Sequence, residues 1–174
     1  MNDVIEETRE FWEMPNKGVF HNAVSAIVGQ RIKFIEARKI RSKLYQLLGD
    51  PYSPEKLLAC KVLPVNDANQ SLLRQVAENH DIEFLKTLRG IGPWTIKSIQ
   101  IMSHLNDNIF LFEDFWIRSR MEELFGKRLT PSSAEKLGNK FLNKSDASRF
   151  FWRIKKQGIQ KVRNEEKLTR EDFV

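Results

Sequence analysis

Two segments of the sequence carry residues that can do chemistry. Residues 88–95 read Leu-Arg-Gly-Ile-Gly-Pro-Trp-Thr. Glycines without Cβ let a phosphate approach the backbone, and the helix that follows offers unpaired N–H groups with partial positive charge. Asp114 lies in an apolar run, residues 109–117, where a sheltered carboxylate can stabilise a developing positive charge or activate water. Together the two segments indicate chemistry on nucleic acid.

Each segment also has a plainer interpretation. Gly-x-Gly spacing occurs in ordinary helical hairpins with a glycine cap. Asp114 is equally suited to cap a helix that begins near Phe115, a role worth about 1 kcal/mol. The capping and catalytic roles are compatible in one carboxylate. Its neighbour Glu113 is interpreted as a solvated surface charge.

Helical periodicity dominates the rest of the chain and strand alternation is scarce, which predicts an all-α protein of many short helices. In the longest predicted helix, Ile35, Ile40, Leu44 and Leu47 are expected to face inward. The charged tail beyond Gly158 is expected to fray. The expected helices cover residues 20–28, 34–48, 54–60, 67–78, 82–88, 94–105, 115–125 and 147–157, with another that begins at Thr130-Pro131.

The turn within residues 88–95 is expected to place both of its glycines, Gly90 and Gly92, at positive φ. Ile91 between them would anchor the turn in the core. Pro93 would fix the entry angle of the next helix, and since it has no N–H it wastes no donor.

Composition narrows the class of protein. The 174 residues suffice for one or two small domains with a real core. A net charge of +6 favours an anionic partner. No apolar run reaches membrane-spanning length and the N-terminus lacks a signal peptide's pattern, so we expect a cytoplasmic, nucleoid-associated or, in a eukaryote, nuclear protein. One cysteine and three histidines exclude an internal disulfide, a structural zinc site and a four-cysteine iron–sulfur cluster.

Three segments resemble one family, the helix-hairpin-helix DNA glycosylases, and in particular the alkyl-base branch that includes 3-methyladenine DNA glycosylase II. Residues 88–95 match its Leu-x-Gly-Ile-Gly-x-Trp-Thr hairpin. Asp114 lies twenty positions after Trp94, where the family has its catalytic aspartate. Residues 20–30 resemble its first core helix and the Gly-Gln loop that wedges into DNA.

The resemblance implies an all-α helix-hairpin-helix glycosylase fold over residues 1–174, with two lobes and the active-site cleft between them. The hairpin-containing lobe would cover about 30–110, and 1–29 plus 111–174 would form the second lobe. It implies a monofunctional DNA glycosylase of base excision repair that hydrolyses the N-glycosidic bond of a flipped, damaged base, an alkylated purine such as 3-methyladenine. Two alternatives stay open: a glycosylase of this fold for uracil, hypoxanthine or an oxidised purine, and a non-catalytic helix-hairpin-helix DNA-binding module.

The resemblance also assigns roles to residues. Asp114 would be catalytic, and Trp94, Trp12 and Phe20 would line the base pocket. Trp94 stands where glycosylases with lyase activity carry a lysine, so we expect hydrolysis by water without a covalent intermediate. Residues expected to contact DNA are Gly90, Ile91, Gly92, Thr95, Lys97, Gln30 and Arg31.

Some of these contacts have a plainer alternative. Gln30 and Arg31 would read base edges and fill the gap left by the flipped base, or form a surface turn. Lys97 would be a phosphate contact or an exposed charge. Two basic runs would either bind phosphate or form solvated faces. The runs are Lys33, Arg38, Lys39, Arg41 and Lys43, and Arg153, Lys155, Lys156, Lys161 and Arg163.

The expected partner is double-stranded DNA with a damaged base, bound by a monomer that has no membrane contact. No cofactor and no side-chain metal site are expected, although the resemblance allows a monovalent cation on hairpin carbonyls near Leu88 and Gly90. Residues 144–148 lack the aromatic that the alkyl-base branch often carries before its last helix. The lesion therefore stays open.

Overall fold

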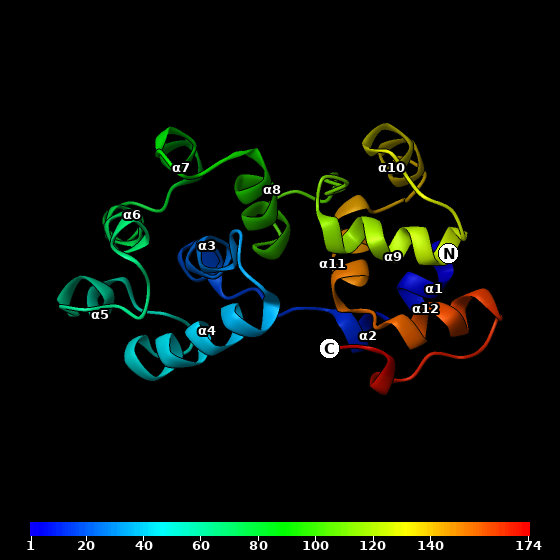
Figure 1. The fold of residues 1–174 in the computed structure, drawn as a ribbon, viewed down its shortest axis with the longest axis horizontal. Coiled ribbons are helices and arrows are strands. Elements are labelled where there is room, and N and C mark those ends of the chain that lie inside the picture. Colours follow the sequence, from blue (N-terminus) through cyan, green and yellow to red (C-terminus); the bar gives the residue numbers. More distant parts are fainter. The chain divides into compact units, whose positions relative to one another are not determined.

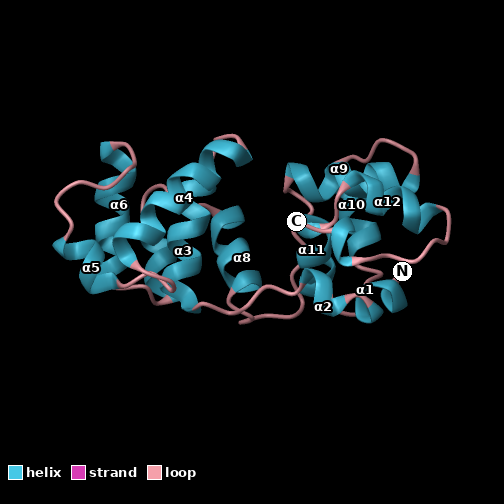
Figure 2. Cartoon of the chain, turned by 90° about the horizontal axis from the view of Figure 1, so that it is seen from below, coloured by secondary structure: helices cyan, strands magenta, loops and turns pink.

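A computed structural model describes the whole chain, Met1 to Val174, and the chain is all-helical as predicted (Figures 1 and 2). Twelve α-helices and one 3-10 helix are joined by short segments. Ile154 and Phe173 form an isolated β-bridge. None of the helices has the length and apolar character that crossing a membrane requires.

The chain folds into two compact units. Unit 1 combines residues 1–15 with residues 104–174, and unit 2 is residues 16–103. The expected boundary near residue 29 differs from the observed one, because α3 (Gly18–Gly29) belongs to unit 2. Its apolar face, with Ala23, Val24 and Ile27 fully buried, packs against other helices of that unit.

Unit 2 is built around α3, which lies among α4, α6 and α8 in Figure 1. The remaining helices of this unit are α4 (Phe34–Leu48), α5 (Pro54–Ala59), α6 (Asp67–Glu78), α7 (Ile82–Thr87) and α8 (Pro93–Met102). The predicted bounds of α4 and α6 are confirmed, and Ser53 and Asp81 cap α5 and α7 as expected. These helices begin where local capping chemistry places them.

The predicted inward face of α4 is partly wrong. Leu44 is buried, but Ile35 and Leu47 are exposed. The buried face is Ala37, Leu44 and Leu48, which share one side of the helix because they lie three to four residues apart or a multiple of that spacing. The first turn of α4 therefore presents apolar side chains to solvent.

Unit 1 is organised around α11, which packs against α1, α2 and α9. Its helices are α1 (Asn2–Glu7), α2 (Arg9–Trp12), α9 (Phe115–Phe125), α10 (Pro131–Gly138), α11 (Lys144–Arg153), α12 (Lys156–Arg163) and the 3-10 helix η1 (Arg170–Asp172). The two N-terminal helices were not predicted. They are short, and tertiary contacts such as the ion pair between Arg9 and Asp146 at 2.5 Å hold them on α11.

Two expectations for the C-terminal part are wrong. The single helix expected over 147–157 is two helices, because the chain is extended at Ile154 and Lys155. The tail does not fray. The buried Asp172 carboxylate accepts hydrogen bonds from Lys161 Nζ at 2.9 Å and the Thr169 backbone N–H at 2.8 Å. Charged residues order this tail because they are paired within it.

Candidate active site and nucleic-acid interface

The hairpin of unit 2 has the predicted form. Helix α7 ends at Thr87, the Ile91 N–H donates to the Leu88 carbonyl at 3.1 Å, and α8 begins at Pro93. The Ile91 side chain is buried in the core of unit 2, as expected for an anchor. The buried Ile91 side chain thus anchors the turn to the core, while Gly90 and Gly92 of the turn are exposed.

The two glycines of the turn do different things. Gly90 has φ +102, a conformation that favours glycine. Gly92 has φ −96 and ψ 175, which any residue adopts, so the expectation of positive φ is wrong there. A Cβ at Gly92 would meet no atom within 4 Å. The fold requires glycine at position 90, whereas at position 92 it leaves open space against the backbone.

Helix α8 begins without a capping side chain. Gly92 is its N-cap and Pro93 occupies the first helical position. Backbone N–H groups in the first turn of a helix have no partner within the helix, and the helix dipole adds partial positive charge there. With Gly92 and Pro93 both exposed, this N-terminus is suited to an anion such as a phosphate.

The Gln30 side chain is hydrogen-bonded to the hairpin. Its Nε2 donates to the Gly90 carbonyl at 3.1 Å and to Thr95 Oγ1 at 2.8 Å. Thr95 is buried, and its hydroxyl accepts this internal bond. Gln30 thus forms a brace between the end of α3 and the hairpin, and base reading by Gln30 and DNA contact by Thr95 stay predictions.

The carbonyls of Leu88 and Gly90, named above for a monovalent cation, each accept a hydrogen bond, from the Ile91 N–H and from Gln30 respectively. A carbonyl oxygen has two lone pairs, so these bonds leave each oxygen one further acceptor position. A monovalent cation on these two carbonyls stays a prediction. No group of three or more His, Cys, Asp or Glu side chains is placed to hold a metal ion.

Arg31 directly follows the brace. It is exposed and has φ +56, a left-handed conformation uncommon for a residue with a Cβ. Strain of this kind costs about 1–2 kcal/mol and is found most often where a loop has a function. The expected wedge residue is thus presented to solvent by a tight turn.

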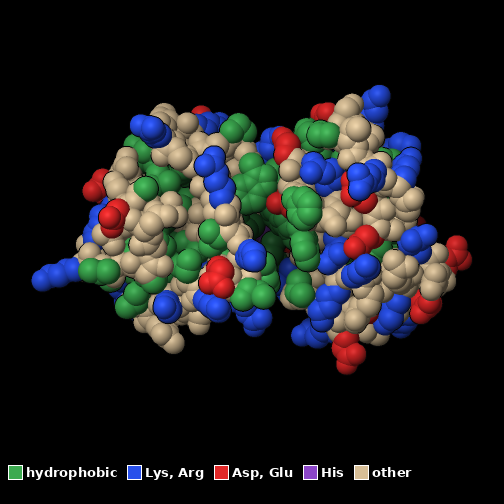
Figure 3. Space-filling model, viewed as in Figure 1, with side chains coloured by type: hydrophobic (Ala, Val, Ile, Leu, Met, Phe, Trp, Pro, Cys, Tyr) green, Lys and Arg blue, Asp and Glu red, His purple; other side chains and the backbone are tan.

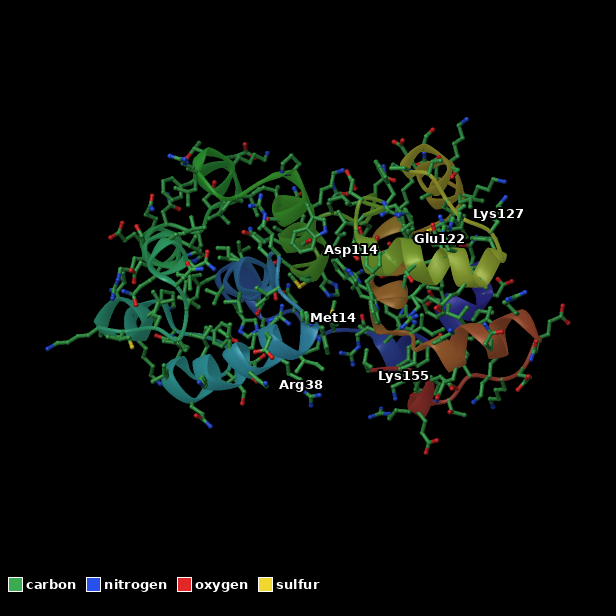
Figure 4. The ribbon with its side chains drawn as sticks, viewed as in Figure 1. Met14, Arg38, Asp114, Glu122, Lys127 and Lys155 are labelled. Atoms are coloured by element: carbon green, nitrogen blue, oxygen red, sulfur yellow. The ribbon has the colours of Figure 1, made fainter.

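In unit 1, Asp114 is the N-cap of α9 (Figure 4). Its Oδ1 accepts hydrogen bonds from the backbone N–H groups of Trp116 at 2.9 Å and Ile117 at 3.0 Å. The helix start predicted at Asp114 is confirmed. Two backbone N–H groups of the first turn of α9 thus orient the carboxylate. Glu113 is exposed, and the helix cap does not use its side chain.

Two aromatic side chains directly after Asp114 were not predicted as part of a site. Phe115 is 72% exposed. The Trp116 ring lies under the Arg120 guanidinium at 4.3 Å, and Arg120 Nε donates to the Ile154 carbonyl at 3.0 Å. The spacing of Trp116 and Arg120, four positions on one helix, was the available signal. The start of α9 thus combines a fixed carboxylate with exposed aromatic surface.

Two of the three expected pocket aromatics lie in cores. Trp12 is fully buried in unit 1, where its Nε1 donates to the Ile5 carbonyl at 2.9 Å. Phe20 is buried in unit 2 with its ring 5.6 Å from that of His80. A ring enclosed in this way offers no face to a base, so the pocket role is wrong for both. Trp94, in the first turn of α8, is half-buried and stays a candidate.

The basic runs divide into engaged and exposed side chains. Arg41 donates to the Ser25 carbonyl at 2.8 Å, Lys155 Nζ donates to the Glu171 carbonyl at 2.8 Å, and Lys161 pairs with Asp172. Lys97 is half-buried on α8. Elsewhere, Lys and Arg side chains mix with Asp and Glu over the visible face of each unit (Figure 3). The runs are therefore not uniform phosphate-binding faces. The exposed members are Lys33, Arg38, Lys39, Lys43, Lys156 and Arg163. Two of them are also engaged, since Lys39 pairs with Glu36 and Arg163 donates to the Glu123 carbonyl.

Comparison with known proteins identifies the fold. No protein-family model matches the sequence, and a search of curated proteins finds no match. The structure is similar to a 3-methyladenine DNA glycosylase from Archaeoglobus fulgidus, with TM-score 0.69 and 18% sequence identity over 78% of this chain and 57% of that one. This chain therefore matches little more than half the length of that protein.

A second similar structure is a 3-methyladenine DNA glycosylase from Schizosaccharomyces pombe in complex with abasic DNA. Its TM-score is 0.66 at 17% identity, and the match covers 84% of this chain and 88% of that one. Identities this low carry the fold alone. The chain thus has the all-helical fold of the 3-methyladenine DNA glycosylases, as the resemblance of its hairpin had implied.

Proposed function

We propose that this protein is a monofunctional DNA glycosylase that hydrolyses the N-glycosidic bond of a damaged base in double-stranded DNA. The similarity of its fold to two DNA glycosylases supports the class of enzyme, and the abasic DNA bound to one of them supports DNA as the partner. The observation that carries the proposal is the fixed carboxylate of Asp114, anchored through Oδ1 at the start of α9.

The chemistry follows from charge. Cleavage of an N-glycosidic bond develops positive charge on the deoxyribose, and a fixed anion stabilises that state without reorganising during the reaction. The same carboxylate can orient or deprotonate the attacking water. In this proposal unit 1 supplies the carboxylate, and unit 2 holds a phosphate on the N-terminus of α8, assisted by a monovalent cation on the hairpin carbonyls.

The proposed substrate is an alkylated purine, with 3-methyladenine as the first candidate. Alkylated purines are often cationic, and the electron-rich face of Trp94 would favour such a base. Uracil, hypoxanthine and oxidised purines are the alternatives. Because Trp94 stands at the position where a lyase needs an amine, the proposed reaction forms no covalent intermediate.

The test compares Asp114→Asn with Glu113→Gln on a panel of duplexes that each carry one lesion. Asparagine caps helices as well as aspartate does, so the fold should survive. Loss of the charge should slow single-turnover base release by about 100-fold or more, as when other electrostatic catalytic groups are removed. Glu113→Gln removes a neighbouring charge and should release base at the wild-type rate.

Unchanged base release by Asp114→Asn would show that Asp114 acts only as a helix cap. A protein that binds the duplexes but releases no base from any of them would be a DNA-binding module. For the lyase question, borohydride should trap no protein–DNA adduct, and efficient trapping would show that an amine takes part.

A further inference from the structure

Arg120 of α9 is a buried arginine with three different partners. Its side chain is almost enclosed, with the residue 8% exposed. Its Nε donates to the Ile154 carbonyl at 3.0 Å, and its Nη1 donates to Glu123 Oε2 at 2.8 Å. Its guanidinium also lies 4.3 Å from the centroid of the Trp116 ring. A cation withdrawn from water interacts more strongly with a ring face than one at the surface, so this contact holds both side chains in place.

The backbone group that anchors Arg120 lies in the core of unit 1. Ile154 is fully buried, ends α11 as its C-cap and forms the β-bridge with Phe173. Carbonyls at the end of a helix have no donor within it, and Arg120 supplies one to Ile154. Helix α9, which packs on α11 (Figure 1), is thereby tied to the end of that helix.

Trp116 connects this anchor to Asp114. The Trp116 backbone N–H donates to Asp114 Oδ1 at 2.9 Å, and the ring of the same residue contacts Arg120. Residues four positions apart lie on the same side of a helix, which is why the guanidinium covers the ring. The Ile154 carbonyl, Arg120, Trp116 and the Asp114 carboxylate therefore form one continuous series of contacts.

The pairing of Arg120 with Glu123 limits its effect on the charge of Asp114. The two side chains form an ion pair at 2.8 Å on α9. A lone cation close to Asp114 would offset part of the negative charge that the proposed reaction uses, whereas a cation paired with a carboxylate has little net charge. Arg120 is therefore suited to hold Trp116 in place without opposing the charge of Asp114.

We propose that Arg120 is a positioning residue for Asp114, which acts by fixing Trp116 and with it the first turn of α9. This inference rests on the proposed function. A fixed anion stabilises developing charge without reorganising, and a displacement of about 1 Å can cost on the order of 100-fold in rate. The helix cap sets where the carboxylate lies relative to the first turn of α9. Arg120 sets where that turn lies within unit 1.

The experiment compares Arg120→Met with Arg118→Met, each alone and combined with Asp114→Asn. Methionine keeps an unbranched apolar chain but has neither the charge nor the donors. Arg118 is the matched control, since it lies on the same helix and its half-buried side chain has no ion pair or hydrogen bond. All assays run well below the unfolding temperature of each variant, because Arg120→Met leaves Glu123 and the Ile154 carbonyl without their donor and should unfold earlier.

Single-turnover base release at saturating protein should fall about tenfold in Arg120→Met, while affinity for a duplex with a stable abasic-site analogue stays within twofold. Combined with Asp114→Asn, the same substitution should cause no further loss, because the carboxylate that Arg120 positions is gone. A residue that only stabilises the fold would lower the rate in both backgrounds. Arg118→Met should release base within twofold of the wild-type rate.

Amide hydrogen exchange measured by NMR provides a readout that does not depend on catalysis. The Trp116 N–H should exchange at least about fivefold faster in Arg120→Met than in wild type, while amides in the middle of α11 keep their rates. Arg120→Lys keeps the charge and can reach the Ile154 carbonyl but lacks the planar fork. It should fall between wild type and Arg120→Met in both measurements, and it replaces Arg120→Met should that variant fail to fold.

Three results would overturn the proposal. The first is base release within twofold of wild type in both Arg120 variants, and the second is an equal loss with and without Asp114→Asn. The third is an unchanged exchange rate of the Trp116 N–H. An equal loss of base release in Arg118→Met would also overturn it, because the effect would then not belong to Arg120.

Failure of this inference and failure of the proposed function look different. Wild-type protein that releases no base from any duplex loses the enzyme, and faster exchange of the Trp116 N–H in Arg120→Met would still support the positioning of Asp114. Wild-type protein whose base release is indifferent to Arg120 keeps the enzyme and loses the inference.

Discussion

Helices α8 and α9 differ at their N-termini, because α9 has a side-chain cap and α8 has none. Each N-terminus is the positive end of a helix dipole, where first-turn N–H groups have no acceptor within the helix itself. Helix α9 satisfies them internally, with the carboxylate of Asp114. Helix α8 has Gly92 as its N-cap and no capping side chain. One terminus already holds its anion, and the other is suited to receive one.

The difference shows how a helix N-terminus can serve two roles in the proposed reaction. The filled terminus fixes a negative charge that can face a developing cation. The terminus of α8, which has no side-chain cap, offers positive potential to a phosphate. The comparison predicts that exchanging the two arrangements should exchange their effects on binding, catalysis and stability.

The largest effect is expected from Gly92→Asp, which would give α8 the arrangement of α9. The new carboxylate can cap α8 and would occupy the place proposed for a phosphate. Affinity for duplex DNA should fall by roughly a hundredfold, since like charges brought together cost several kcal/mol. Stability should change by only a few tenths of a kcal/mol, roughly the difference between glycine and aspartate as caps.

The matched control is Gly92→Asn, which has a similar shape and capping capacity without the charge. Anisotropy titrations and thermal unfolding measure both variants. If the Asn and Asp variants weaken DNA binding equally, the N-terminus of α8 contributes to binding only through the open space at Gly92. Its partial positive charge would then not contribute.

The next effect concerns Gly90. Alanine there would be forced to φ +102, with its Cβ 3.3 Å from Leu72 Cδ2. Gly90→Ala should lower the free energy of unfolding by about 1–2 kcal/mol. Chemical denaturation measures this value, and a variant as stable as wild type would mean that the turn readily adopts another conformation.

A smaller effect is expected from removing the cap of α9. Asp114→Ala leaves the Trp116 and Ile117 N–H groups without their acceptor, and should cost about 1 kcal/mol of stability. Asp114→Asn should cost much less, although both variants should lose base release. Equal stability of the two variants would show that the observed cap bonds contribute little.

The smallest effect is expected from Gly92→Ala. Its φ of −96 and the open space around it should keep the free energy of unfolding within about 0.5 kcal/mol of wild type. Duplex affinity should still fall, by a few-fold, because a methyl group narrows the approach to the backbone. A large loss of stability would contradict the conformation described here for this turn.

Features with a local cause were predictable. The bounds of α4 and α6 follow from apolar spacing, and the starts of α5, α7, α9 and α10 follow from their capping residues. The hairpin and the helix cap at Asp114 were predictable for the same reason, because the residue types within each short segment indicate its chemistry. The identity of the lesion has no such pattern and was left open.

Features that depend on distant partners were missed. Trp12, Phe20 and Ile35 are all apolar, and nothing in their local spacing distinguishes a core residue from an exposed one. Packing against Phe150 encloses Trp12, whereas the start of α4 leaves Ile35 in solvent. The same holds for the C-terminal tail, where Lys161 of α12 pairs with Asp172 eleven residues later.

By itself, the sequence determined the helical class, the hairpin with its uncapped helix and the aspartate that begins α9, because these depend on interactions within a few residues. Only the tertiary structure decided which aromatic side chains are enclosed, that Gln30 braces the hairpin and that Phe34 and Ile35 at the start of α4 are exposed. Burial and long-range hydrogen bonds are made between segments far apart in the chain, so no local pattern of residues encodes them.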